Sequence, residues 1–175
     1  MSKGTTTLKT ERLLLRRHKI EDAKVLHEHF GLDPVMFRYS GWNPYATKEA
    51  AEGMVRQFIA SYQDEHFYGW AIEYEDRLIG TIGAYDYDSA ASRIEVGCSI
   101  EAASWGKGFG SEAVRAVLEY LTEQEGIRCV MAWCAAENIG SSKIMERAGM
   151  RRTSVEENAI EVDGKKYDKW NYEYA

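Results

Sequence analysis

The feature that most constrains this chain is a strand, a glycine-rich loop and a helix in immediate succession between residues 93 and 125. Over Arg93–Ile100 the even positions are apolar and the odd positions are polar or glycine. That period of two predicts a β-strand with one buried face and one polar face. Trp105–Gly110 then supplies three glycines, and Ser111–Glu125 places apolar residues at the spacing of one helical face.

The glycine-rich loop is suited to an anion, because a helix start exposes backbone N–H groups and the positive end of the helix dipole. Gly106, Gly108 and Gly110 allow close approach of a ligand to the backbone, and Lys107 adds a positive charge. The expected ligand is a phosphate or pyrophosphate, although the spacing matches neither the Walker loop nor the dinucleotide-binding fingerprint. A simple glycine turn has the same composition, so the loop alone leaves both interpretations open.

The remaining pattern predicts seven strands and four helices in the order βααβββαβαββ. Helices interleave with a mixed sheet in this order, which is typical of an α/β or α+β domain with three layers. Helices are expected at residues 20–30, 47–62, 111–125 and 138–147, and strands at 6–16, 67–74, 78–85, 93–100, 128–135, 150–156 and 166–174.

Length and composition restrict the class of protein. A chain of 175 residues is expected to form a single domain over residues 1–175. Its net charge of −6 argues against a nucleic-acid partner. Three cysteines without a CxxC pattern indicate neither a disulfide framework nor a metal site. No apolar stretch has the length of a membrane helix or signal peptide, so we expect a cytoplasmic protein without a membrane partner.

Two segments resemble motifs of the GNAT superfamily of N-acetyltransferases. Ser104–Ala113 is similar to its pyrophosphate-binding motif, [Q/R]xxGxG/A at the start of a helix, with Trp105 where Gln or Arg is commonest. Glu137–Met150 is similar to its ENxxSxxxxEKxGF segment. The resemblance extends from Thr6 to Tyr174 and is strongest to the ribosomal-protein N-terminal alanine acetyltransferases. It implies a mixed, mostly antiparallel sheet of about seven strands flanked by about four helices.

The resemblance implies acetyl-CoA as co-substrate and assigns residues to it. In this family the pantetheine arm pairs like an extra strand with the strand before the glycine loop. Asn138 would hold the same arm, while also serving as a helix cap, and Ser141 would lie near the thiol. The cofactor-binding residues expected on this basis are Cys98, Ser99, Ile100, Trp105, Gly106, Lys107, Gly108, Phe109, Gly110, Ser111, Asn138 and Ser141.

The implied chemistry is attack of an amine on the thioester. Glu95 is the expected general base, directly or through an ordered water, because this family often places a glutamate on that strand. A solvated strand glutamate is the alternative. Ser141 is the expected general acid, since Met145 stands where many relatives have a tyrosine; Tyr120 and Tyr167 stay open. Backbone N–H groups near Ile100 are suited to the carbonyl oxygen.

Aromatic residues are the expected lining of an acceptor groove, although aromatics of this density are also ordinary packing residues. Asp86 and Asp88 either attract an amine or cap a turn. The aromatic residues expected to line the acceptor groove are Tyr39, Trp42, Tyr45 and Tyr85, and Trp70 and Tyr87 are further candidates for the same lining.

The acceptor stays open between a protein N-terminus and a small-molecule amine, and a homodimer is compatible with the family. A non-catalytic acyl-CoA sensor and a different nucleotide-phosphate enzyme are the competing functions.

Overall fold

The computed structural model describes residues 1–175 and contains one eight-stranded sheet with the order β1-β2-β3-β4-β5-β6-β8-β7. All neighbouring strands are antiparallel except β5 and β6, which are parallel, so the expected mixed and mostly antiparallel sheet is confirmed. The strands are β1 (Leu8–Lys9), β2 (Leu13–Arg16), β3 (Tyr68–Tyr74), β4 (Arg77–Asp88), β5 (Arg93–Ile100), β6 (Cys129–Ala135), β7 (Arg151–Val162) and β8 (Lys165–Tyr174).

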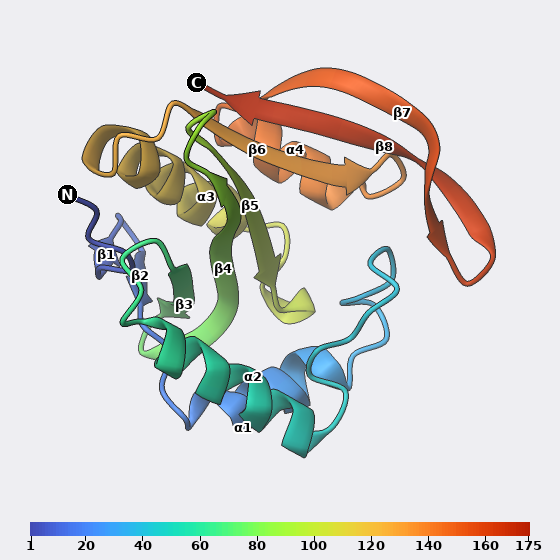
Figure 1. The fold of residues 1–175 in the computed structure, drawn as a ribbon. Coiled ribbons are helices and arrows are strands. Elements are labelled where there is room, and N and C mark those ends of the chain that lie inside the picture. The colour runs from blue at the N-terminus through green and yellow to red at the C-terminus, as the bar shows by residue number, and fades with distance from the viewer.

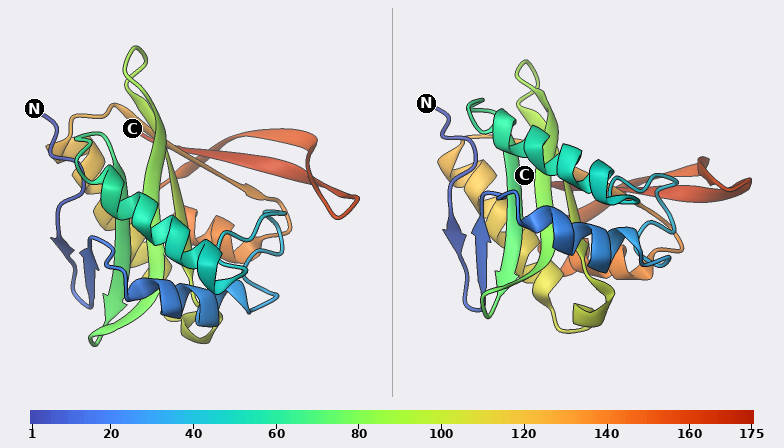
Figure 2. Two further views of the ribbon diagram at one scale, coloured as in Figure 1. Left: turned by 60° about the horizontal axis from the view of Figure 1, so that its bottom comes forward. Right: turned by 90° about the horizontal axis from the view of Figure 1, so that it is seen from below.

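Helices cover both faces of the sheet. α1 (Asp22–Leu26) and α2 (Lys48–Ser61) lie side by side on one face, and α3 (Phe109–Glu119) and α4 (Ile139–Arg147) lie on the other (Figures 1 and 2). α1 and α3 each continue into a single π-helical turn. No helix combines the length and the apolar composition that crossing a membrane requires.

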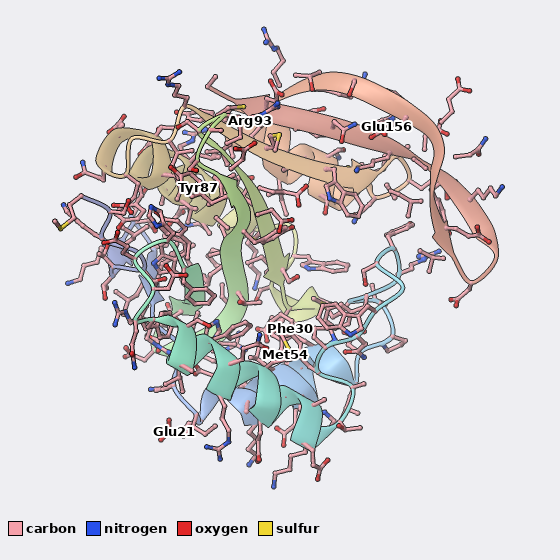
Figure 3. All side chains as sticks on the ribbon, viewed as in Figure 1. Glu21, Phe30, Met54, Tyr87, Arg93 and Glu156 are labelled. Atoms are coloured by element: carbon pink, nitrogen blue, oxygen red, sulfur yellow. The ribbon has the colours of Figure 1, made fainter.

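Each pair of helices closes its own hydrophobic core. The larger core has 26 buried residues between the sheet and helices α3 and α4, and it includes the even positions Ile94, Val96 and Ile100 of β5. The smaller core has eight buried residues beneath α1 and α2, among them Phe30, with Met54 packed against them (Figure 3). The three-layer architecture follows from this division.

The one parallel pairing in the sheet is short. β5 pairs with β6 only at Arg93–Cys129, Ile94–Val130 and Glu95–Met131. β4 nevertheless stays paired with β5 as far as Ile100, and β8 with β6 as far as Ala135. Beyond Glu95 the facing edges of β5 and β6 therefore have no strand partner, and the two strands diverge (Figure 1).

The expected count of seven strands was too low, because residues 6–16 form a hairpin of two short strands. The turn forms because the Thr10 hydroxyl accepts from the Leu13 N–H at 2.9 Å and the Thr10 N–H donates to the Leu13 carbonyl at 3.0 Å. β7 extends to Val162, six residues beyond its expected end at Glu156, as the long twisted ribbon with β8 in Figure 2.

Candidate functional site

The gap between β5 and β6 continues into a cleft with a volume of about 990 Å³. The cleft extends from the start of α3, past the ends of β5 and β6, to the loop between α1 and α2. Most of the residues assigned from the sequence are brought together here. The expected residues that line it are Tyr39, Trp42, Tyr85, Cys98, Ser99, Ile100, Trp105, Gly106, Gly108, Phe109, Gly110, Ser111, Asn138 and Ser141.

The glycine loop requires glycine for two different reasons. Gly106 and Gly108 have φ values of 77° and 80°, a left-handed backbone that L side chains rarely adopt. Gly108 caps α3, which begins at Phe109, two residues before the expected start. Gly110 lies so close to α4 that an added Cβ would be 2.6 Å from the Ile144 Cδ1 atom. The residues from Gly108 to Ser111 line the cleft, and the two glycines among them leave the start of α3 with little side-chain cover.

Trp105 occupies the position where the family motif usually has Gln or Arg. Its indole Nε1 donates to the Ile100 carbonyl at 2.6 Å, while the ring stays about half exposed at the cleft. This bond ties the beginning of the glycine loop to the last residue of β5. The departure from the motif therefore has a structural role in fixing the loop.

A second contact holds the loop from the β1–β2 turn, and it was not predicted from the sequence. Arg12 stacks on the Phe109 ring at 4.5 Å, donates to Glu112 at 2.8 Å and donates to the Lys107 carbonyl at 3.0 Å. Burial opposes ionisation of Glu112, but hydrogen bonds from Thr10 and Arg12 outweigh it and lower the pKa of that carboxyl. The Lys107 side chain is exposed and does not line the cleft.

Two cations of α4 line the cleft and were also missed. Lys143 and Arg147 are four residues apart, so they share one face of the helix. Both are exposed. Their spacing of four residues can be read from the sequence. Their position at the anion-binding end of the cleft cannot, because it depends on the packing of α4 beside α3. They increase the positive potential where phosphates are expected.

Asn138 caps α4 as expected: its side-chain oxygen accepts from the Ser141 N–H at 3.3 Å. The cap fixes Ser141 in the first turn of the helix, where both residues line the cleft. The Asn138 amide nitrogen is left for another partner, so the capping role and a ligand-binding role are compatible.

Glu95 is half-buried on the polar face of β5, where it is the register partner of Tyr85 on β4 and of Met131 on β6. Burial and the nearby Asp86 raise the pKa of Glu95, and Lys169 and the Tyr85 hydroxyl act in the opposite direction. A carboxyl with a raised pKa beside a cleft is suited to accept a proton. Tyr85 lines the cleft, whereas Glu95 is not among the lining residues.

The acceptor end of the cleft is aromatic. Tyr39 packs edge-on against Tyr167 of β8 at 5.5 Å, and its hydroxyl donates to the Glu137 carbonyl at 3.4 Å. Trp133 of β6, which was not assigned from the sequence, also lines this end, and the Lys169 ammonium lies 5.0 Å from its ring. Trp133 sits in an almost continuously apolar strand, so nothing in its local sequence distinguishes it from a core residue.

Two aromatic residues expected in the groove are packing residues instead. Tyr45 is 4% exposed in the smaller core, with its ring 6.0 Å from Phe37, and burial raises its pKa to about 12. Trp70 is fully buried, and its indole donates to the Thr6 carbonyl at 2.6 Å. The assignments were wrong because a large ring is as suited to filling a core as to lining a groove.

Tyr120, Tyr87 and Asp88 do not line the cleft and have structural partners elsewhere. The Tyr120 hydroxyl donates to the Gly4 carbonyl at 2.6 Å. The Tyr87 ring stacks on His66, with the ring centres 4.9 Å apart. The Asp88 side chain accepts from the N–H groups of Ala90 and Ala91, so it caps a turn.

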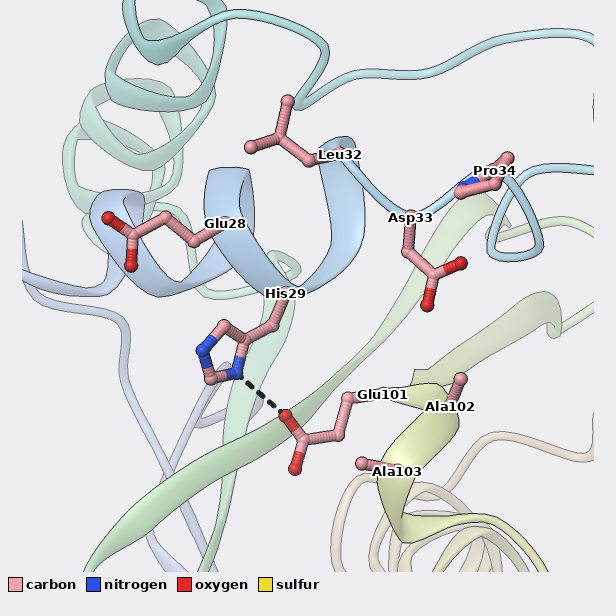
Figure 4. Close-up of a pocket in the computed structure, with 8 residues that line it drawn as sticks. All are labelled: Glu28, His29, Leu32, Asp33, Pro34, Glu101, Ala102 and Ala103. Atoms are coloured by element: carbon pink, nitrogen blue, oxygen red, sulfur yellow. Dashed lines mark hydrogen bonds and ion pairs between the residues drawn. The ribbon is translucent and has the colours of Figure 1, made fainter.

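A smaller hollow of about 410 Å³ lies beside the end of β5 (Figure 4). The buried carboxylate of Glu101 accepts here from Arg77 at 2.6 Å and from Ser104 at 2.9 Å, and His29 lies 3.0 Å away. Burial opposes ionisation, but these partners outweigh it and lower the pKa of Glu101. Ser104 also lines the cleft, so this junction fixes the chain that enters the glycine loop.

Comparison with known proteins agrees with this geometry. Residues 12–151 match the acetyltransferase (GNAT) domain. The uncharacterised N-acetyltransferase YoaA of Bacillus subtilis (strain 168) is 31% identical over 163 residues, 92% of each chain. A GNAT-family acetyltransferase from Bacillus anthracis is 25% identical, with a TM-score of 0.85 over 97% of this chain and 98% of its own. RimL, the ribosomal L7/L12 alpha-N-protein acetyltransferase in complex with coenzyme A, is 17% identical, with a TM-score of 0.86 over 97% of each chain. The chain therefore belongs to the GNAT family of acetyltransferases.

Proposed function

We propose that this chain binds acetyl-CoA in the cleft between β5 and β6 and transfers the acetyl group to a primary amine. The observation that carries the proposal is the divergence of the two strands beyond Glu95, which leads directly to the first turn of α3. Unpaired strand edges suit the amides of a pantetheine arm, and a helix start suits a pyrophosphate. The complex of RimL with coenzyme A supports the same choice of ligand.

Different residues along the cleft would bind different parts of acetyl-CoA. The backbone of Cys98, Ser99 and Ile100 would pair with the pantetheine arm, and the free amide nitrogen of Asn138 would hold it from α4. The amides from Lys107 to Ser111 would hold the pyrophosphate, with Lys143 and Arg147 neutralising charge nearby. The bound thioester supplies an activated acetyl group, and the protein orients it and removes protons.

Glu95 would accept the proton of the amine, directly or through a water that it orders. The amine nitrogen then forms a bond to the acetyl carbon as the carbon–sulfur bond breaks. Backbone N–H groups at the end of β5 would stabilise the carbonyl oxygen. Ser141 would donate a proton to the leaving thiolate and regain one from water, while Glu95 returns its proton to solvent. The nitrogen thus loses one proton for each proton that the sulfur gains, and an amine that arrives as an ammonium releases one further proton to solvent.

The proposal includes two classes of acceptor for the acetyl group: a protein N-terminus or a small-molecule amine. The two sequence motifs favour the branch of ribosomal-protein N-terminal acetyltransferases, and the structural likeness to RimL is compatible with it. Because one fold hosts many acceptors, this likeness alone does not choose between them.

The first test is calorimetric titration with acetyl-CoA, followed by measurement of coenzyme A release with a panel of amines. We expect saturable binding to one site and turnover with at least one amine. Binding without turnover would favour an acyl-CoA sensor. Displacement of acetyl-CoA by ATP or NAD would favour a different nucleotide-phosphate enzyme, and absence of binding would reject the proposal.

A further inference from the structure

The acceptor end of the cleft is lined by several exposed apolar side chains. Trp42 is 65% exposed, Tyr85 45%, Val35 44% and Trp133 39%, and all four line the same cleft. They come from three separate parts of the chain: the loop between α1 and α2, strand β4 and strand β6. Exposed apolar residues scattered singly need no explanation, but several that converge on one cleft indicate a binding surface.

Few charged side chains line the acceptor end of the cleft. Arg38 and Glu137 are its only lining residues with formal charges, since Lys143 and Arg147 belong to α4 at the other end. Arg38 lies 5.5 Å above the Tyr39 ring, and the Glu137 carboxylate pairs with Lys165 at 3.3 Å. Asp86 and Glu156 lie outside the lining. A ligand with several positive charges would therefore find no unpaired carboxylate in the lining itself, since Glu95 and the nearby Asp86 both lie outside it.

Two aromatic rings flank the proposed base. Tyr85 is directly opposite Glu95 on β4. Its hydroxyl lies next to Gly97, and the hydroxyl oxygen would be 3.1 Å from a Cβ added to that glycine. On the other side, Glu95 is paired with Met131, and Trp133 follows two residues later on the same face of β6. An amine beside Glu95 would consequently have its carbon body against the rings of Tyr85 and Trp133.

From these placements we propose that the acceptor is a primary amine carried on an apolar, preferably aromatic, body rather than on a polycation. This inference rests on the proposed function and narrows its substrate. The chemistry is shared by arylalkylamines and by peptides whose first residue is apolar. Burial of such a body against Tyr85, Trp133 and Trp42 would supply binding energy. The faces of Tyr85 and Trp42 tolerate the incoming ammonium before it loses its proton, whereas the Lys169 ammonium already lies 5.0 Å from the Trp133 ring.

The test compares kcat/KM for 2-phenylethylamine, for a peptide with N-terminal phenylalanine, for spermidine and for a peptide with N-terminal aspartate. We expect the two apolar acceptors to exceed their polar counterparts by about tenfold or more, as burial of an apolar group in a pocket typically provides. The better of the two apolar acceptors then identifies the source of the amine. Equal or higher kcat/KM with spermidine would overturn the inference while leaving the proposed function intact. Turnover with no amine at all would instead count against the proposed function.

Two tryptophan variants test whether the preference for apolar amines arises at the acceptor end of the cleft. Trp42→Ala lies in an exposed loop and Trp133→Ala in β6; each is expected to lower the ratio of kcat/KM for 2-phenylethylamine to kcat/KM for ethanolamine about tenfold. Ile59→Ala is the matched control, because Ile59 is 41% exposed on α2 outside the cleft. Equal effects on both amines in the tryptophan variants would contradict the inference. Circular dichroism of each variant separates loss of fold from loss of preference.

Discussion

At the scale of single residues, the chemistry depends on how the surroundings of Glu95 set its proton affinity. Burial and the Asp86 carboxylate favour the protonated form, and Lys169 and the Tyr85 hydroxyl favour the ionised form. Arg93, which precedes it on the same face, is occupied by an ion pair with Glu173 of β8. The net effect is a raised pKa, so the basic form of Glu95 becomes available at higher pH than for an ordinary glutamate.

Asp86→Asn tests this arrangement. Removal of a negative charge near Glu95 lowers the pKa of Glu95, so the acidic limb of the kcat/KM–pH profile should move to lower pH. Asn is compatible with the positive φ of 57° at this position. Asp88→Asn is the control, because Asp88 caps the neighbouring turn. A limb that stays in place, or moves to higher pH, would contradict the role assigned to Asp86.

Glu95→Gln tests the base itself. It should lower kcat by about 10²- to 10⁴-fold, the usual contribution of a general base, because the amide cannot accept the proton. The dissociation constant for acetyl-CoA, measured by calorimetry, should stay unchanged. Glu157→Gln on the exposed strand β7 is the control. Unchanged turnover in Glu95→Gln would leave the base to another group or to water.

At the scale of elements, the site depends on how α3 and α4 meet. Gly110 in the first turn of α3 packs against Ile144 of α4 with no space for a Cβ. This contact joins the start of α3, which is expected to hold the pyrophosphate, to the second turn of α4, whose cap and first turn carry Asn138 and Ser141. A change at the contact should therefore affect both stability and binding of acetyl-CoA.

Gly110→Ala is expected to lower the free energy of unfolding by about 1–3 kcal/mol, as overpacking does, and to weaken binding of acetyl-CoA. The losses in the double variant with Ile144→Ala should be smaller than the sum of the two single losses, because Ile144→Ala removes the atoms that the new Cβ meets. Gly53→Ala in α2 is the control, since no atom lies within 4 Å of its added Cβ. Urea denaturation and calorimetry measure the two effects; strict additivity would argue against a direct clash.

The sequence predicted elements well where local pattern determines them. The bounds of β5 were correct because its alternation is uninterrupted, and the cap of α4 at Asn138 was correct because cap chemistry is local. The first residue of α3 was missed because a left-handed glycine cap has no separate signature. Tyr45 was wrongly assigned to the cleft and Trp133 was missed there, since only tertiary packing decides which large ring is covered.

At the scale of the whole molecule, a buried ion-pair network joins the sheet to the helices on one face. Arg16 of β2 donates to Asp22 of α1 at 2.8 Å and to Glu73 of β3 at 2.7 Å. Burial alone would raise the pKa of Asp22, but bonds from Arg16, His18 and Lys19 outweigh it, and its pKa lies far below the usual range. Asp22 is 3% exposed, so its charge is balanced by these partners rather than by water.

Stability should consequently fall in acid. A carboxyl whose pKa is depressed in the folded state contributes stability that is present above about pH 4, its unfolded pKa, and is lost as the pH falls below that value. Asp22→Asn should lower the free energy of unfolding at neutral pH by about 3–5 kcal/mol and flatten its dependence on acid. Urea denaturation at several pH values measures both effects. Glu21→Gln, next along the chain and exposed, is the control; equal losses in both variants would refute the assignment.

The divergence of β5 and β6 has a consequence for inhibition. The outer edges of the sheet are protected, one by the very short strand β1 and the other by the charged strand β7. The inner edges are instead open to any chain that offers hydrogen bonds in strand geometry. A short extended peptide meets that description as well as a pantetheine arm does. Strand-mimicking inhibitors without a nucleotide therefore offer a route into this cleft.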